Sequence, residues 1–147
     1  MPIIKGRVMA VDWGEARIGV ALSDPTRTLA TPLVTLSEKD KGLQIRKVAA
    51  LAAEHEATLV LVGLPLHLDG RDSASTVTAR KFAAKLALVI APIPVELVDE
   101  RLSSVEAAER LSETTRKKVD RLALDRAAAA VLLQGWLDVH GTRGETS

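Results

Sequence analysis

The chain has 147 residues, nearly half of them hydrophobic, a size and composition that suit one domain with a sizeable core. It has no cysteine, which excludes disulfides and cysteine-based zinc sites, and we expect neither a signal peptide nor a membrane-spanning segment. The net charge is +1 and aromatic residues are scarce, so a nucleic-acid surface would have to be a local basic patch rather than an aromatic stacking platform.

Two short apolar runs, residues 7–11 and 18–22, flank a turn and predict a β-hairpin. We expect Gly14 to provide a positive φ in this turn, and Gly19 to mark a bulge or a close backbone approach. Asp12 stands where a buried strand meets the turn, a rigid position that still reaches solvent. It therefore suits a metal ligand, and the alternative is that it only caps the turn.

The rest of the chain alternates between strand and helix patterns. We expect a strand at 31–36, a helix at about 39–56 capped by Ser37, a strand at 59–62, a loop beginning at Gly63, a helix at 74–90, a strand at 95–98, a helix from Ser103 or Ser104 to about 111, and a last helix at about 119–139. Strands separated by helices pair in parallel, which predicts an α/β fold. Its five-stranded mixed sheet would be a β-meander followed by alternating helices and strands, flanked by helices. Residues 1–140 would form a single domain, and 141–147 a flexible tail.

Acidic residues recur where ligands collect in such sheets, beyond the carboxyl ends of the strands. Asp12 and the pair Asp99–Glu100 each follow a strand, and Asp125 lies on the apolar stripe of the last helix. Carboxylates brought together repel one another, and divalent cations remove that repulsion. Oxygen ligands favour Mg²⁺ or Mn²⁺, and two such ions can activate water and stabilise the leaving oxygen of a phosphodiester.

The choice between Asp99 and Glu100 depends on strand geometry. Adjacent side chains of a strand point to opposite faces, and Asp99 shares a face with Val95 and Leu97 that we expect to be packed under a helix. Glu100 leaves the strand and has the reach to approach Asp12. We therefore favour Glu100 as the ligand and keep Asp99 as its rival.

Asp125 also has alternatives. It could stand at the rim of the apolar stripe and pair with Arg121 or Arg126, since ion pairs are common structural features. Asp120 is a rival acid five positions earlier, but that spacing places it well round the helix from the stripe. His67 lies in the loop after Gly63, where an accessory role is open.

Basic residues near the strand ends are candidates for phosphate contacts. Guanidinium groups donate two parallel hydrogen bonds to phosphate oxygens. Arg17 and Arg101, which lie inside the acidic motifs, are the preferred nucleic-acid-binding residues, followed by Arg80 and Lys81.

Four ordered motifs, at residues 12–24, 62–70, 99–107 and 125–137, resemble the YqgF/RuvX family. This is a ribonuclease H-like group related to the RuvC Holliday-junction resolvases. The resemblance implies a ribonuclease H-like fold and a bacterial cytoplasmic nuclease that matures the 5′ end of the small-subunit ribosomal RNA precursor. It also implies an acidic triad of Asp12, Glu100 and Asp125.

Two other functions are compatible with the sequence. One is a Holliday junction resolvase-like DNA nuclease in recombination or repair, which would use the same chemistry on a branched substrate. The other is a non-catalytic RNA-binding factor in transcription or ribosome assembly. RNA is the expected partner, with DNA junctions as the alternative. No dimer face is readable, so we expect a monomer or a weak homodimer.

Overall fold

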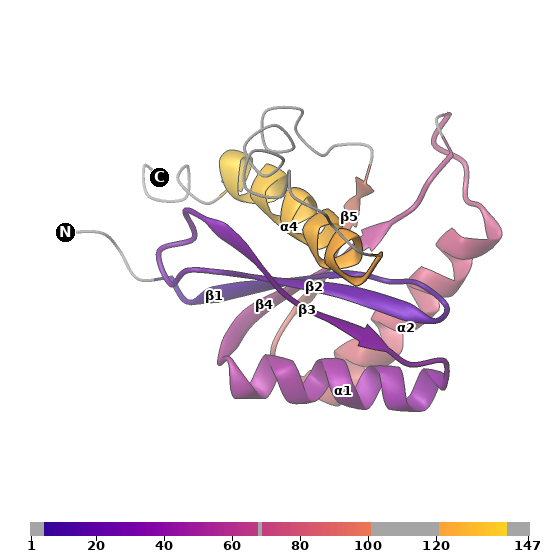
Figure 1. The fold of residues 1–147 in the computed structure, drawn as a ribbon, viewed down its shortest axis with the longest axis horizontal. Coiled ribbons are helices and arrows are strands. Elements are labelled where there is room, and N and C mark those ends of the chain that lie inside the picture. The colour runs from indigo at the N-terminus through magenta and orange to yellow at the C-terminus, as the bar shows by residue number, and fades with distance from the viewer. Residues whose placement is uncertain (1–4, 68, 101–120, 141–147) are drawn as a thin grey trace.

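A five-stranded sheet forms the middle layer of the protein, with helices on both of its faces (Figure 1). The computed structural model describes residues 5–67, 69–100 and 121–140. Its elements are β1 (Arg7–Asp12), β2 (Arg17–Ser23), β3 (Ala30–Ser37), α1 (Lys41–Glu54), β4 (Ala57–Leu64), α2 (Ala74–Ile90), β5 (Val95–Asp99) and α4 (Arg121–His140). None of the helices in these ranges is long and apolar enough to cross a membrane.

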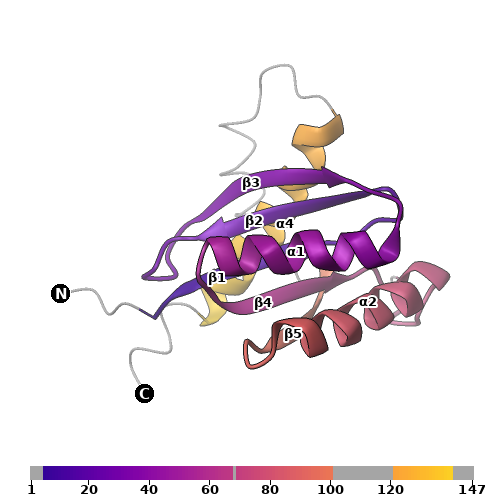
Figure 2. The same ribbon diagram turned by 90° about the horizontal axis from the view of Figure 1, so that it is seen from below.

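The strand order is β3-β2-β1-β4-β5, which confirms the predicted mixed sheet. The meander β1–β2–β3 pairs antiparallel, whereas β4 pairs parallel to β1 and β5 parallel to β4. α1 and α2 provide the crossovers between the parallel strands and cover one face of the sheet, and α4 covers the other (Figure 2). The central strand is β1, so its carboxyl end lies in the middle of one edge of the sheet.

Alternation along β1 sorts its side chains between the two layers. Met9 and Val11 belong to the core beneath α1 and α2. Val8 and Ala10 belong to the core beneath α4. Asp12 continues the second series, so its carboxylate belongs to the face that α4 covers.

The helix limits agree with the sequence in one case and differ in another. α2 spans 74–90 as predicted, and a capping box between Ser73 and Thr76 fixes its start. The predicted cap Ser37 of the preceding helix is wrong. Asp40 caps α1, its side chain accepting from the Leu43 amide, because β3 continues through Ser37, which pairs with Arg17. The helix expected up to residue 111 and the tail 141–147 lie outside the described residues.

A buried glutamine fastens α4 to the link between β2 and β3. The Gln134 side chain is 1% exposed; its Oε1 accepts from the Ala30 amide at 2.9 Å and its Nε2 donates to the Thr28 carbonyl at 3.1 Å. A buried amide is costly unless it is hydrogen-bonded, so these contacts also favour one docking position for the helix.

Candidate active site

Asp12 ends β1, and the loop that follows it is held by a second buried glutamine. The Trp13 indole donates to Gln44 Oε1 at 3.1 Å, and Gln44 Nε2 donates to the Glu15 and Glu38 carbonyls at 3.0 and 2.7 Å. Gly14 does not have the positive φ that we predicted. It is needed for space instead, since a Cβ there would lie 2.5 Å from the Arg17 carbonyl oxygen.

Two glycines flank Asp12 on the neighbouring strands. On β2, Gly19 pairs directly with Asp12. On β4, Gly63 follows Val62, the partner of Val11. We predicted Gly63 as the start of a loop, and it lies within β4 instead. Asp12 therefore stands between two positions that carry no side chain.

Gly63 makes room for Glu100. β4 separates β5 from β1, so a side chain from the end of β5 has to pass over β4 to approach Asp12. A Cβ on Gly63 would lie 2.7 Å from Glu100 Oε1 and 3.0 Å from Leu132 Cδ2 of α4. The Glu100 carboxylate thus occupies the space that a side chain at position 63 would fill.

Gly19 makes room for the backbone of α4. A Cβ there would lie only 1.9 Å from the carbonyl oxygen of Asp125, a separation that no real structure tolerates. The predicted close approach at Gly19 is confirmed. Because the helix backbone rests on β2 at this residue, Asp125 is brought to the same edge of the sheet as Asp12.

The carboxyl groups of Glu100 and Asp125 interact electrostatically with that of Asp12. Burial raises the pKa of Asp12 to about 8, with further contributions from a hydrogen bond with Glu100 and from the negative charges of Glu100 and Asp125. Burial and the hydrogen bond with Glu100 thus favour the protonated form of Asp12 while no cation is bound. Asp125 has a cationic partner, since Arg17 Nε donates to its Oδ2 at 2.7 Å.

A cleft of about 330 Å³ opens over Asp12 and Glu100, and the α4 residues Ala128, Val131 and Leu132 complete its lining. The donors are carboxylate oxygens, a set that fits a hard divalent cation. Within the described ranges, no three acidic or histidine side chains converge as a ready-made metal shell. One oxygen of Asp125 is engaged by Arg17 instead.

Asp99, the rival of Glu100, is the last residue of β5 and pairs with Leu64. It is not among the residues that line the cleft. The expectation that its face is packed under a helix is wrong at Leu97, which is 42% exposed because β5 is an edge strand of the sheet.

The other predicted residues are dispersed. Arg80 is held by Asp72, with Nε–Oδ2 and Nη2–Oδ1 distances of 3.0 and 3.2 Å. Lys81 belongs to a hollow between α1 and α2, on the opposite face of the sheet from α4. His67 is exposed and does not line the cleft. Arg101 and Asp120 lie outside the described residues, so phosphate binding by the arginines stays a prediction.

The sequence profile of the RuvX family, described as Holliday junction resolvase, matches residues 6–139. The chain belongs to this family. Among curated RuvX relatives, a candidate pre-16S rRNA nuclease of Mycobacterium ulcerans is 46% identical over 139 residues, which cover 94% of this chain and 82% of the relative. One of the same name from Mycolicibacterium smegmatis is 47% identical over 138 residues, covering 91% and 81%.

Solved structures support the ribonuclease H-like resolvase fold of this RuvX chain. RuvC of Thermus thermophilus in complex with a Holliday junction substrate aligns with a TM-score of 0.61 at 15% identity, over 92% of this chain and 97% of that one. The yeast mitochondrial Holliday junction resolvase Ydc2 aligns with a TM-score of 0.59 at 11% identity, over 99% and 86%. At these identities the likeness concerns the fold alone.

Sequence reasoning missed two residues that shape the site. Gly63 carried a signal, since it follows a wholly apolar strand, but its function depends on which strand lies between β1 and β5. Gln44 carried none, because a glutamine in a helix is ordinarily solvated.

Proposed function

We propose that this RuvX protein is a divalent-metal-dependent nuclease that processes the 5′ end of pre-16S rRNA in the bacterial cytoplasm. The observation that carries the proposal is the grouping of Asp12, Glu100 and Asp125 around one sheet edge. Gly63 leaves room for the Glu100 side chain, and Gly19 leaves room for the Asp125 backbone. Membership of the RuvX family supports nuclease activity, and the names of the mycobacterial relatives support the RNA substrate.

Asp12, Glu100 and Asp125 would hold the cation. Bound Mg²⁺ or Mn²⁺ supplies an activated water and stabilises the leaving oxygen of the phosphodiester. Asp12 has to release its proton to act as a ligand, because only the ionised carboxylate offers both oxygens. Arg17 pairs with Asp125 in the absence of the cation and would be free to donate to a substrate phosphate once a cation takes its place.

The test compares matched single-stranded RNA, single-stranded DNA and four-way DNA junctions, each incubated with Mg²⁺, Mn²⁺ or excess chelator. We expect metal-dependent cleavage that Asp12→Asn abolishes while substrate binding persists. Equal cleavage by the wild-type protein in excess chelator contradicts the mechanism.

A second pair of variants distinguishes the role of Glu100 from that of Asp99. Glu100→Gln should abolish cleavage with little change in melting temperature, because its side chain lies in the cleft beside Asp12. Asp99→Asn should leave cleavage in place and act on stability. A folded but inactive Asp99→Asn beside an active Glu100→Gln would move the proposed triad by one residue.

A second candidate is a DNA junction nuclease. The description of the family and the fold shared with RuvC favour it. Cleavage of the four-way junction in preference to RNA would select this function. Salt-dependent RNA binding without cleavage by either metal would instead select the non-catalytic RNA-binding factor.

A further inference from the structure

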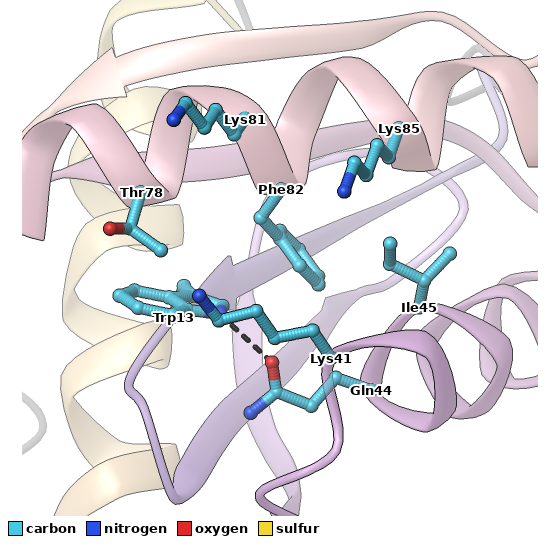
Figure 3. A pocket seen from close by; sticks show the side chains of 8 residues that line it. All are labelled: Trp13, Lys41, Gln44, Ile45, Thr78, Lys81, Phe82 and Lys85. Carbon is cyan, nitrogen blue, oxygen red and sulfur yellow. Dashed lines mark hydrogen bonds between the residues drawn. The ribbon is translucent and has the colours of Figure 1, made fainter.

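A hollow lies between α1 and α2, on the face of the sheet opposite to α4 (Figure 3). It has a volume of about 100 Å³, enough for a phosphate group with some water. Trp13, Ile45 and Phe82 form its apolar wall, and Lys41 reaches across it from α1 toward Trp13.

The polar lining of the hollow is cationic. Lys41 comes from the first turn of α1, and Lys81 and Lys85 are four residues apart on α2 and therefore neighbours on one helix face. No carboxylate lines the hollow, and the ion pairs found among the described residues do not include these three lysines. Like charges four residues apart destabilise a helix, and an anion between them removes that cost.

The neutral groups of the lining have partners of their own. The Gln44 amide is engaged by Trp13 and by backbone carbonyls, and the Thr78 hydroxyl donates to the Ala74 carbonyl at 3.1 Å. Recognition in the hollow is thus left to the lysine ammonium groups, which bind phosphate as point charges. All three lysines are exposed, so salt screens their attraction to phosphate.

We propose that the hollow lined by Lys41, Lys81 and Lys85 is a phosphate-binding site, which takes a phosphate of a nucleic acid strand or of a free nucleotide. Trp13, which lines the hollow, is the residue next to Asp12. A nucleic acid strand that crosses the sheet edge at the cleft can therefore continue into the hollow. Binding of a nucleic acid strand in the hollow rests on the proposed nuclease function, whereas binding of a free nucleotide does not.

The first arm of the test measures RNA binding in the Asp12→Asn background with magnesium present. The double variant Lys81→Gln/Lys85→Gln is compared with Arg46→Gln/Lys47→Gln, which removes two positive charges from the exposed side of α1. Fluorescence anisotropy over a range of salt gives the slope of log affinity against log salt. We expect the slope to become shallower by about 0.7 for each lost phosphate contact in the α2 variant only.

The second arm titrates inorganic phosphate and adenosine monophosphate into Trp136→Phe protein, in which Trp13 is the remaining tryptophan. A saturable change in fluorescence that Lys81→Gln/Lys85→Gln abolishes supports the free nucleotide as occupant. A change in the RNA slope supports the strand. The proposal is overturned if the two double variants match in both arms while thermal melting shows both to be folded.

The proposed nuclease function fails separately from this site. Absence of metal-dependent cleavage by the wild-type protein contradicts the function and leaves the binding comparison intact. Cleavage by the wild-type protein, with both double variants alike in both arms, contradicts the site alone.

Discussion

Adding one methyl group at Gly19 tests the contact that brings Asp125 to the site. In Gly19→Ala the new Cβ would lie 1.9 Å from the Asp125 carbonyl oxygen and 2.4 Å from its carbonyl carbon. Real Cβ contacts are essentially never shorter than 3.0 Å, so the backbone of α4 has to retreat by more than an ångström. A side chain could rotate away, but a helix backbone moves only as a unit.

Overpacking of this kind costs about 1–3 kcal/mol, and we expect the upper end because the obstacle is backbone. For a chain of this length, about 3 kcal/mol lowers the melting temperature by roughly 6–12 °C. The Asp125 carboxylate moves with its backbone, so cleavage should fall more than the stability loss explains.

The matched control is Gly42→Ala, which adds the same methyl group within α1. There the nearest atom is Asp40 Oδ1 at 3.3 Å, which has to yield by only a few tenths of an ångström. Alanine is favoured over glycine in helices by about 1 kcal/mol, and a small shift of the Asp40 cap offsets part of that gain, so the control should stay near the wild-type stability. Thermal melting and cleavage assays decide the matter. A Gly19→Ala protein with the melting temperature of the control and a normal cleavage rate would refute the packing that we describe.

Three further predictions concern the surroundings of Asp12. Because the pKa of Asp12 is raised, its contribution to stability is fully present below pH 3.8 and is lost as pH rises toward 8, so metal-free Asp12→Asn should gain melting temperature over the wild-type protein between pH 4 and 9. The opposite trend in a pH series of melting curves would contradict the raised pKa of Asp12. Gly63→Ala should displace the Glu100 side chain and reduce cleavage with little loss of stability, since that side chain can rotate; an unchanged cleavage rate would show that Glu100 does not need this space. Gln44→Leu should cost about 2 kcal/mol in denaturant unfolding by leaving the Trp13 N–H and loop carbonyls unpaired, and a cost near zero would mean that water replaces the amide.

The sheet could be predicted because local patterns determine it. Strand-length apolar runs and intervening helical periods gave the order of elements, and the start of α2 carries its own signal at Ser73. The start of α1 did not, because Ser37 and Asp40 are both good capping residues and the choice depends on how far β3 continues to pair with β2.

The grouping of the acids was partly accessible from sequence. Asp12 and Glu100 follow strand ends, which places them at one edge by topology alone. The partner of Asp125 was not accessible. The sequence offered Arg121 or Arg126 nearby, but the structure pairs Asp125 with Arg17, more than a hundred residues away, because α4 lies across β2. Pairs of that separation follow from docking rather than from local spacing.

Because α4 follows all five strands in the chain, it is synthesised after them. The helix covers the apolar face that carries Val8, Ala10 and Leu61, and it also carries Asp125, whose charge acts on Asp12. A ribosome that has made residues 1–120 has already produced Asp12 and Glu100, but neither the cover nor the third acid. If Asp125 belongs to the proposed triad, a nascent chain that lacks α4 cannot cut RNA, and covering of this core and onset of activity become a single event.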